Sequence, residues 1–312
     1  MAKDRAIKRV LVSLGILDRA RLFRDRIVFA CNYAAGNIYR PCRYAYSYIR
    51  FILKKTDNTK AGTKRRYISL LCPTRGRPGW AARFISSVYR TAVMPERIEV
   101  LFCVDSDDED KDSYQSFLKG VKTRFSRLKR CELFIRERTI VSRLWDTLAQ
   151  ECSGDLLIIA NDDQVYVDYG WDVRLDEETK KFPDEIFCMW FNDAQFCENL
   201  ATFPIISRRW FKVLGYLSPG IFKFLNTDAW IHDIARRINR LHYIPDILVE
   251  HLHCDNRKAP FDKTYRIFHP GRYEIVYSEH QLFKKSSSIR EEAAEKLKTA
   301  IDIYKAQTMP IA

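Results

Sequence analysis

Two adjacent carboxylates, Asp162 and Asp163, directly follow the apolar run at residues 156–160. This run predicts a short buried strand. Because open α/β sheets bind ligands beyond the carboxyl ends of their strands, such a strand would bring both acids to a ligand-binding edge. Acids this close repel each other unless a proton or a cation lies between them. Mg²⁺ or Mn²⁺ carrying substrate phosphates suits that position, since both ions accept oxygen ligands. A surface turn after a strand is the alternative interpretation.

Two earlier strands end in residues that could contact a nucleotide. The strand expected at residues 67–72 runs into a turn whose backbone N–H groups, hydroxyl and guanidinium groups suit phosphates. The turn contains Pro73, Thr74, Arg75 and Arg77. The strand expected at residues 98–104 ends at Asp105, an acid that could hydrogen-bond a nucleobase or a ribose. A tight turn with surface arginines and a solvated acidic loop are the alternatives.

The later part of the chain contributes two imidazoles and another acid. His251 and His253 lie two residues apart at the end of a strand expected at residues 243–252, so both side chains would face the same side. Imidazole can complete a Mn²⁺ shell, whereas Mg²⁺ prefers oxygen. Asp228 lies at the start of a helix expected at residues 227–239. It could serve as a general base, although the local pattern alone favours a helix cap.

Strands and helices alternate along the chain from residue 67. Further strands are expected at residues 131–135 and 186–191, and further helices at residues 80–91, 113–125, 140–151 and 288–305. Thr139 is expected to cap the helix at residues 140–151. Alternation at this spacing predicts a doubly wound, mostly parallel α/β sheet with flanking helices.

The excess positive charge lies at the N-terminus. Residues 1–66 contain 17 Lys and Arg against four acids, whereas the rest of the chain carries 36 of each sign. Two apolar stripes at helical spacing predict basic amphipathic helices there. The stripes are Ile7, Val10, Leu11, Leu14 and Leu17, and then Tyr44, Tyr48, Phe51 and Ile52. Such helices are typical of an anionic membrane surface; packing on the body, oligomer contact and nucleic-acid binding are the alternatives.

Composition suggests three segments and an intracellular location. Residues 1–64 would be a basic helical extension with a linker at residues 56–64, residues 65–285 the α/β domain that carries the candidate site, and residues 286–312 a C-terminal helix. Nine scattered cysteines without a Cys-x-x-Cys motif fit a reducing cytoplasm. The longest uncharged N-terminal stretch, residues 27–39, is shorter than the roughly 20 residues of a spanning helix. We therefore expect a cytoplasmic protein that could bind peripherally to the inner face of the membrane.

Taken together, these residues resemble the GT-A-fold glycosyltransferases of the family-2-like kind. The resemblance covers about residues 66–266 and rests on four elements in order. They are Pro73-Thr74-Arg75, Asp105, Asn161-Asp162-Asp163 and Glu250-His251-Leu252-His253. Residues 143–149 also resemble the family's helix that reaches back to the donor. The sequence departs from the family in having Asn-Asp-Asp-Gln in place of Asp-x-Asp, and in its basic N-terminus.

The resemblance implies a role for each candidate residue. The residues implied in nucleotide-sugar binding are Pro73, Thr74, Arg75, Arg77, Asp105, Arg143, Asn161 and Asp162. The implied metal ligands are Asp163, Asp162 and either His251 or His253. Asp228 would deprotonate the acceptor hydroxyl, with Asp193 as the reserve candidate.

The implied activity is sugar transfer from a nucleotide sugar, a UDP-sugar first, to an acceptor hydroxyl with the help of Mn²⁺ or Mg²⁺. The acceptor would be a glycan or a lipid-linked sugar, as in cell-surface glycan or glycolipid synthesis at the membrane face, and nucleic acid is not an expected partner. One alternative is a non-catalytic α/β protein whose basic helices hold membrane or nucleic acid. Another is a sugar nucleotidyltransferase, against which the lack of a glycine-rich phosphate loop after Cys72 counts.

Overall fold

The computed structural model describes residues 16–54, 65–223, 225–268 and 272–308. In this part of the chain, eight strands form one sheet in the order β3-β2-β1-β4-β7-β6-β8-β5. The strands are β1 (Ile68–Pro73), β2 (Ile98–Asp105), β3 (Arg130–Arg136), β4 (Leu156–Ile159), β5 (Gln164–Tyr166), β6 (Cys188–Asn192), β7 (Ile205–Ser207) and β8 (Leu241–His251).

The sheet is largely parallel, as the sequence predicts. Strands β3, β2, β1 and β4 are parallel neighbours, and β6 is parallel to β8. The short strand β7 is antiparallel to both β4 and β6, and β5 is antiparallel to β8. The sequence reasoning did not identify β5 or β7, since a three-residue strand is too short for an alternating pattern.

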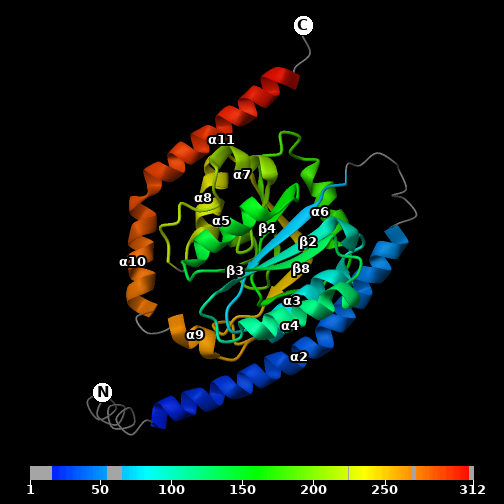
Figure 1. The fold of residues 1–312 in the computed structure, drawn as a ribbon, viewed down its shortest axis with the longest axis vertical. Coiled ribbons are helices and arrows are strands. Elements are labelled where there is room, and N and C mark those ends of the chain that lie inside the picture. Colours follow the sequence, from blue (N-terminus) through cyan, green and yellow to red (C-terminus); the bar gives the residue numbers. More distant parts are fainter. Residues whose placement is uncertain (1–15, 55–64, 224, 269–271, 309–312) are drawn as a thin grey trace, which may run out of the picture.

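Helices flank the sheet (Figure 1). They are α3 (Pro78–Thr91), α4 (Lys111–Arg124), α5 (Val141–Glu151), α6 (Trp171–Thr179), α7 (Arg208–Leu214), α8 (Thr227–Arg237), α9 (Lys263–Phe268), α10 (Arg272–Lys285) and α11 (Ser287–Thr308). The expected cap at Thr139 is wrong, because Ile140 is the N-cap of α5 and no side chain caps this helix. Helices α6, α7, α9 and α10 were not anticipated.

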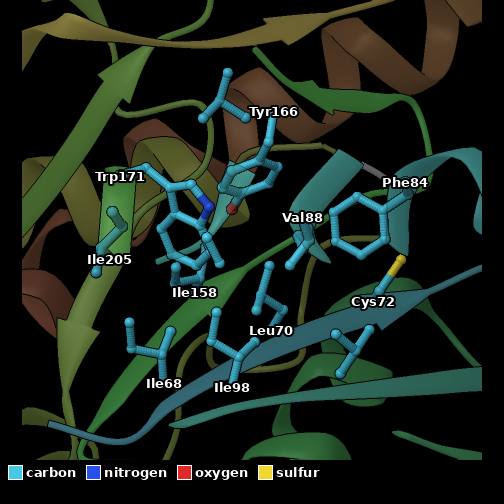
Figure 2. Close-up of a cluster of buried hydrophobic side chains, with 14 of the residues drawn as sticks. Ile68, Leu70, Cys72, Phe84, Val88, Ile98, Ile158, Tyr166, Trp171 and Ile205 are labelled. Atoms are coloured by element: carbon cyan, nitrogen blue, oxygen red, sulfur yellow. The ribbon is translucent and has the colours of Figure 1, made fainter. Parts of the chain in front are cut away.

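Two apolar clusters hold the strands in place, one on each face of the sheet. Consecutive residues of β1 belong to opposite clusters, Leu70 to one and Leu71 to the other, as the alternation of side chains along a strand requires. Figure 2 shows the first cluster, in which Phe84 and Val88 of α3 lie with Tyr166 and Trp171. The predicted inward face of α3, namely Ala81, Phe84, Ile85 and Val88, is fully buried.

The N-terminal extension forms α2 (Ile16–Lys54), a single 39-residue helix that lies along the outside of the body (Figure 1). Tyr44, Tyr48 and Phe51 contact the ring of Tyr169, with centroids 6.1, 4.9 and 5.2 Å away. These three members of the second predicted stripe therefore pack on the body, in line with the packing alternative. Most of the first stripe and the expected linker at residues 56–64 lie outside the described residues. No described helix combines the length and the apolar character needed to cross a membrane.

Candidate functional site

The parallel strands β2, β1 and β4 bring three of the predicted segments to one edge of the sheet. The Thr74 hydroxyl, just beyond β1, donates to Asp162 Oδ2 at 2.5 Å. On the other side of β1, Arg75 Nη1 donates to Asp105 Oδ2 at 2.8 Å. The carboxyl ends of three neighbouring strands therefore supply one continuous line of polar side chains.

The β5–β8 pair adds an imidazole to this edge. Gln164 lies opposite His251, and the Leu252 N–H donates to the Asp163 carbonyl at 2.9 Å. This register places His251 Nε2 3.5 Å from Asp163 Oδ2. Two ligands of one ion lie about 3 Å apart when each is about 2.1 Å from it, so this carboxylate and imidazole are spaced suitably for a shared ion.

His253 lies two residues beyond the end of β8, with its ring centroid 5.3 Å from that of His251. Its Nδ1 accepts the Asp255 N–H at 3.1 Å, so this atom is already used within its own turn. His251 is therefore the better placed of the two predicted histidine ligands. The turn also contains Cys254, and potential ligand atoms of residues 253–255 lie within 4.8 Å of one another. The sequence reasoning did not single out Cys254 or Asp255.

Arg77 lies among the acids as their counter-ion. Its Nη1 is 3.3 Å from Asp162 Oδ1 and 4.0 Å from Asp163 Oδ2. The same guanidinium donates to Asp262 at 2.8 and 3.0 Å and lies 4.2 Å from the centroid of the Tyr265 ring. Asp262 and Tyr265 are site residues that the sequence reasoning missed, since neither follows a recognisable strand.

The two acids of the pair differ in electrostatics. Burial raises the pKa of Asp162 to about 6; the charge of Arg77 opposes this rise and that of Asp163 adds to it. Burial would also raise the pKa of Asp163, but the charges of His251 and Arg77 hold it down at about 2. Burial of the ring lowers the pKa of His251, but the charges of Asp163, Asp193 and Asp228 together outweigh this effect, so the pKa is raised. Asp163 is therefore the acid of the pair that stays ionised to lower pH.

Several buried polar atoms at this edge lack a hydrogen-bond partner in the described part of the chain. They are Asp163 Oδ1, Asp105 Oδ1, both ring nitrogens of His251, and Nε and Nη2 of Arg83. Buried polar atoms are rarely left unpaired, because each loses its hydration without compensation. Carboxylate oxygen and imidazole nitrogen are the donors that Mn²⁺ accepts, so Asp163 and His251 fit a divalent cation.

Arg83 is a second cationic residue that the sequence reasoning did not select. It lies on α3 with its guanidinium 4.3 Å from the centroid of the Trp80 ring. Burial lowers its pKa, as does the nearby charge of Arg40, while Asp162 and Asp163 are close enough to oppose that effect. A guanidinium group with unpaired buried nitrogens is suited to an anionic group of a substrate.

Asp228 lies in the first turn of α8, which begins after Asn226 in a left-handed conformation with φ of 68°. Its Oδ1 accepts the Ala229 N–H at 2.7 Å. The capping role that the local pattern favours is not confirmed, because Asn226 is the N-cap of α8 and no side chain caps this helix. Burial raises its pKa to about 6; the adjacent N–H groups and His251 lower the pKa, and Asp193 raises it. A carboxylate with a pKa near neutrality is a suitable general base.

Asp193 has a structural role. Its Oδ1 accepts the N–H groups of Gln195, Phe196 and Cys197 at 2.8–2.9 Å, and its Oδ2 accepts the Thr202 hydroxyl at 3.0 Å. With both oxygens engaged in fixing this loop, Asp193 is poorly suited to accept a proton from a substrate. The geometry therefore favours Asp228 over the reserve candidate.

Three other predicted donor-binding residues lie around this edge. Pro73 is the last residue of β1. The Asn161 N–H donates to Gln164 Oε1 at 3.2 Å within the turn that carries the acid pair. Arg143 is exposed on the first turn of α5 and lies beside Gly220, where a methyl group on that glycine would come 3.3 Å from Arg143 Nε.

Comparison with known proteins identifies the fold. No family model and no curated protein sequence matches the chain. Among solved structures, it is similar to the mannosyltransferase PcManGT from Pyrobaculum calidifontis in complex with GDP-Man and Mn²⁺. The identity is 13%, the TM-score is 0.52, and the similarity covers 92% of this chain and 88% of that one. The chain therefore has the GT-A-type fold of nucleotide-sugar glycosyltransferases, as the sequence predicts.

Two further structures are similar at lower scores. GalNAc-T7 with UDP, GalNAc and Mn²⁺ gives a TM-score of 0.49 at 14% identity over 60% of this chain and 43% of that one. TarS from S. aureus (residues 1–349) in complex with UDP gives 0.47 at 11% identity over 59% of this chain and 60% of that one.

Proposed function

We propose that this chain is a metal-dependent glycosyltransferase that moves a sugar from a nucleotide sugar to an acceptor hydroxyl. The observation that carries the proposal is the buried contact between Asp163 and His251 at the carboxyl edge of a GT-A-type sheet, with unpaired ligand atoms on both residues. A structural acid–imidazole pair would be expected to satisfy these atoms within the protein. Donor atoms held in this way are typical of a ligand site.

In this proposal Asp163 and His251 hold Mn²⁺ or Mg²⁺, with Asp162 beside them. When bound, the ion would neutralise the diphosphate of the donor and so favour departure of the nucleoside diphosphate. Asp105 presents its unpaired Oδ1 to an N–H or O–H of the nucleoside. Arg75, which already pairs with Asp105, adds positive charge near the phosphates.

Asp228 accepts the proton of the acceptor hydroxyl in this proposal. A pKa of about 6 keeps the carboxylate ionised at neutral pH, while leaving it basic enough to assist the transfer. The unpaired guanidinium nitrogens of Arg83 would stabilise negative charge on the substrate as it develops. Each of these residues acts through a fixed position, so the catalysis would be mainly electrostatic.

A thermal-shift screen of UDP and GDP, each with and without Mn²⁺, tests the donor class, because a ligand that binds the native state raises its apparent stability. We expect a metal-dependent increase in Tm with at least one nucleoside diphosphate, and its loss in Asp163→Ala. Release of nucleoside diphosphate from a nucleotide sugar separates a transferase from a non-catalytic binding protein. A nucleotidyltransferase would instead release pyrophosphate from a nucleoside triphosphate and a sugar phosphate.

We also propose that the acceptor is a glycan or a lipid-linked sugar at the inner face of the membrane. The support is the basic N-terminus, which carries all of the excess charge of the chain. Transfer to a lipid-linked acceptor in vesicles, compared with transfer to the same soluble sugar, is the measurement. Equal rates for the two acceptors would contradict this part of the proposal without affecting the donor assignment.

A further inference from the structure

Helix α2 reverses the usual arrangement of an amphipathic helix on a globular protein. Such a helix normally buries its apolar stripe and exposes its charges. In residues 27–53 of α2 the only charged residues are Arg40, Arg43 and Arg50, and all three pair with acids of the body. The side of α2 that faces away from the body is left uncharged.

These three ion pairs fix the rotation of α2 about its axis. Arg40 lies 2.6 Å from Glu250, Arg43 lies 2.7 Å from Asp168, and Arg50 lies 3.6 Å from Asp246. Glu250 and Asp168 are buried, so loss of Arg40 or Arg43 would remove a cationic partner from a buried carboxylate. The arginines are therefore positioned for holding α2 on the body rather than for contacting an external surface.

The outward side of α2 is an exposed apolar stripe. Its members recur at spacings of three, four and seven residues, as one face of a helix requires. They are Ile27, Cys31, Ile38, Cys42, Ala45, Ile49 and Leu53. Ile38 and Leu53 are each 70% exposed and Ile49 is 57% exposed. Exposed tyrosines border the stripe, namely Tyr39, Tyr46 and Tyr48, and tyrosine is suited to the boundary between water and lipid.

We infer that this stripe of α2 docks on an anionic lipid bilayer, with the helix lying in the plane of the membrane surface. Both ends of the stripe are basic, since residues 16–26 contain four Arg against two Asp, and residues 50–55 contain one Arg and two Lys with no acid. This charge complements anionic headgroups. At about 1.5 Å per residue, the stripe is about 40 Å long, and its attachment to the body along this length favours an in-plane orientation (Figure 1).

A second copy of this chain is the competing occupant of the stripe. Packing of two α2 helices in either relative direction would bring basic ends together, because both ends of the helix carry net positive charge. Like charges at such contacts oppose association. Anionic lipid removes this repulsion, and for this reason the bilayer is the favoured partner. Membrane binding through α2 is independent of whether sugar transfer is confirmed.

The test compares two double variants of the full chain in a flotation assay. The first is Ile49→Glu with Leu53→Glu on the outward side of α2. The matched control is Ile289→Glu with Ile303→Glu on α11, where the isoleucines are 42% and 51% exposed. Vesicles of neutral phosphatidylcholine, alone or with a third of phosphatidylglycerol, provide the surface. Because burial of each apolar side chain contributes to partitioning, we expect the α2 variant to lose at least tenfold in affinity for anionic vesicles.

The wild-type chain and the α11 control should bind anionic vesicles equally well and neutral vesicles more weakly. Equal binding by the α2 variant, or no binding by the wild-type chain, would overturn the inference. Light scattering after gel filtration tests the competing occupant. A wild-type dimer that becomes a monomer in the α2 variant, together with an absence of vesicle binding, would identify a second copy as the partner. Unchanged thermal unfolding of both variants serves as the folding control.

Discussion

The proposed base Asp228 provides the sharpest test of the site, since one group determines both a rate and a stability. Its pKa of about 6 implies that about 90% of the carboxyl groups are ionised at pH 7, half at pH 6 and about 10% at pH 5. A rate that depends on the ionised form should therefore fall about tenfold between pH 7 and pH 5. The assay is the pH dependence of kcat/KM, which reports the pKa of the base in the free enzyme.

The isosteric variant Asp228→Asn should lower kcat by about a hundredfold or more, because general-base catalysis contributes typically 10²–10⁴-fold. Donor affinity should be nearly unchanged, since Asp228 contacts the helix start and is not among the proposed donor or metal ligands. The Asn oxygen can still accept the Ala229 N–H, which preserves the local structure. A variant that keeps both the wild-type rate and its acid limb would refute the assignment of Asp228 as base.

The same pKa predicts an opposite effect of this variant on stability. Because the folded state binds the Asp228 proton more tightly than the unfolded chain, ionisation destabilises the fold as pH rises from about 4 to about 6. A pKa difference of about two corresponds to about 3 kcal/mol. The neutral Asn should therefore raise the free energy of unfolding by up to about 3 kcal/mol at pH 7.5 and by little at pH 4. Urea unfolding at the two pH values provides the measurement, and an equal effect at both would contradict the pKa argument.

Two further predictions concern the acids and the cation of the site, and a third concerns the packing at the opposite end of β4. In metal-free protein with chelator at pH 7.5, Asp162→Asn should raise the free energy of unfolding and Asp163→Asn should lower it. The reason is that burial raises the pKa of Asp162, whereas nearby cations lower the pKa of Asp163. Effects of the same sign in the two variants would contradict this electrostatic difference between the acids. Arg77→Met should lower the free energy of unfolding by about 3–5 kcal/mol, since it leaves buried acids without a cation. In the same unfolding assay, added Mn²⁺ should stabilise this variant more than it stabilises the wild type. Gly154→Ala should cost about 1–3 kcal/mol of unfolding free energy, because the new methyl group would overlap Ser69 Oγ and lie 2.8 Å from the Ser69 backbone nitrogen.

The strand ends could be predicted from the sequence because a parallel sheet brings distant segments together by a simple rule. Apolar runs indicated β1, β2 and β4, and their carboxyl ends are neighbours in the sheet. The polar residues that follow these runs therefore had to meet, as the contacts of Thr74 with Asp162 and of Arg75 with Asp105 show. The local sequence pattern was sufficient to predict these contacts, because the carboxyl ends of neighbouring parallel strands always lie at the same edge of the sheet.

The contacts that depend on tertiary packing could not be predicted in the same way. Asp262 and Tyr265 follow no apolar run, and only the folded chain brings them to Arg77. Asp193 resembles Asp228 in sequence as an isolated acid near an element boundary. The three backbone N–H groups on its Oδ1, which distinguish its role, depend on the path of the loop. Hydrogen-bond partners of this kind are not encoded in residue spacing.

The β5–β8 pair connects the candidate site to the helix on the outside of the protein. Asp163 directly precedes β5 and His251 ends β8, so this pair of strands sets the distance between the two proposed metal ligands. The neighbour of His251 in sequence, Glu250, is held from α2 by Arg40 and from the following turn by Lys258. Helix α2 therefore contacts the residue that directly precedes a proposed metal ligand, His251. If α2 lies on a membrane, the orientation of the nucleotide-sugar site relative to that surface is fixed by the same ion pairs that help to hold β8 in place.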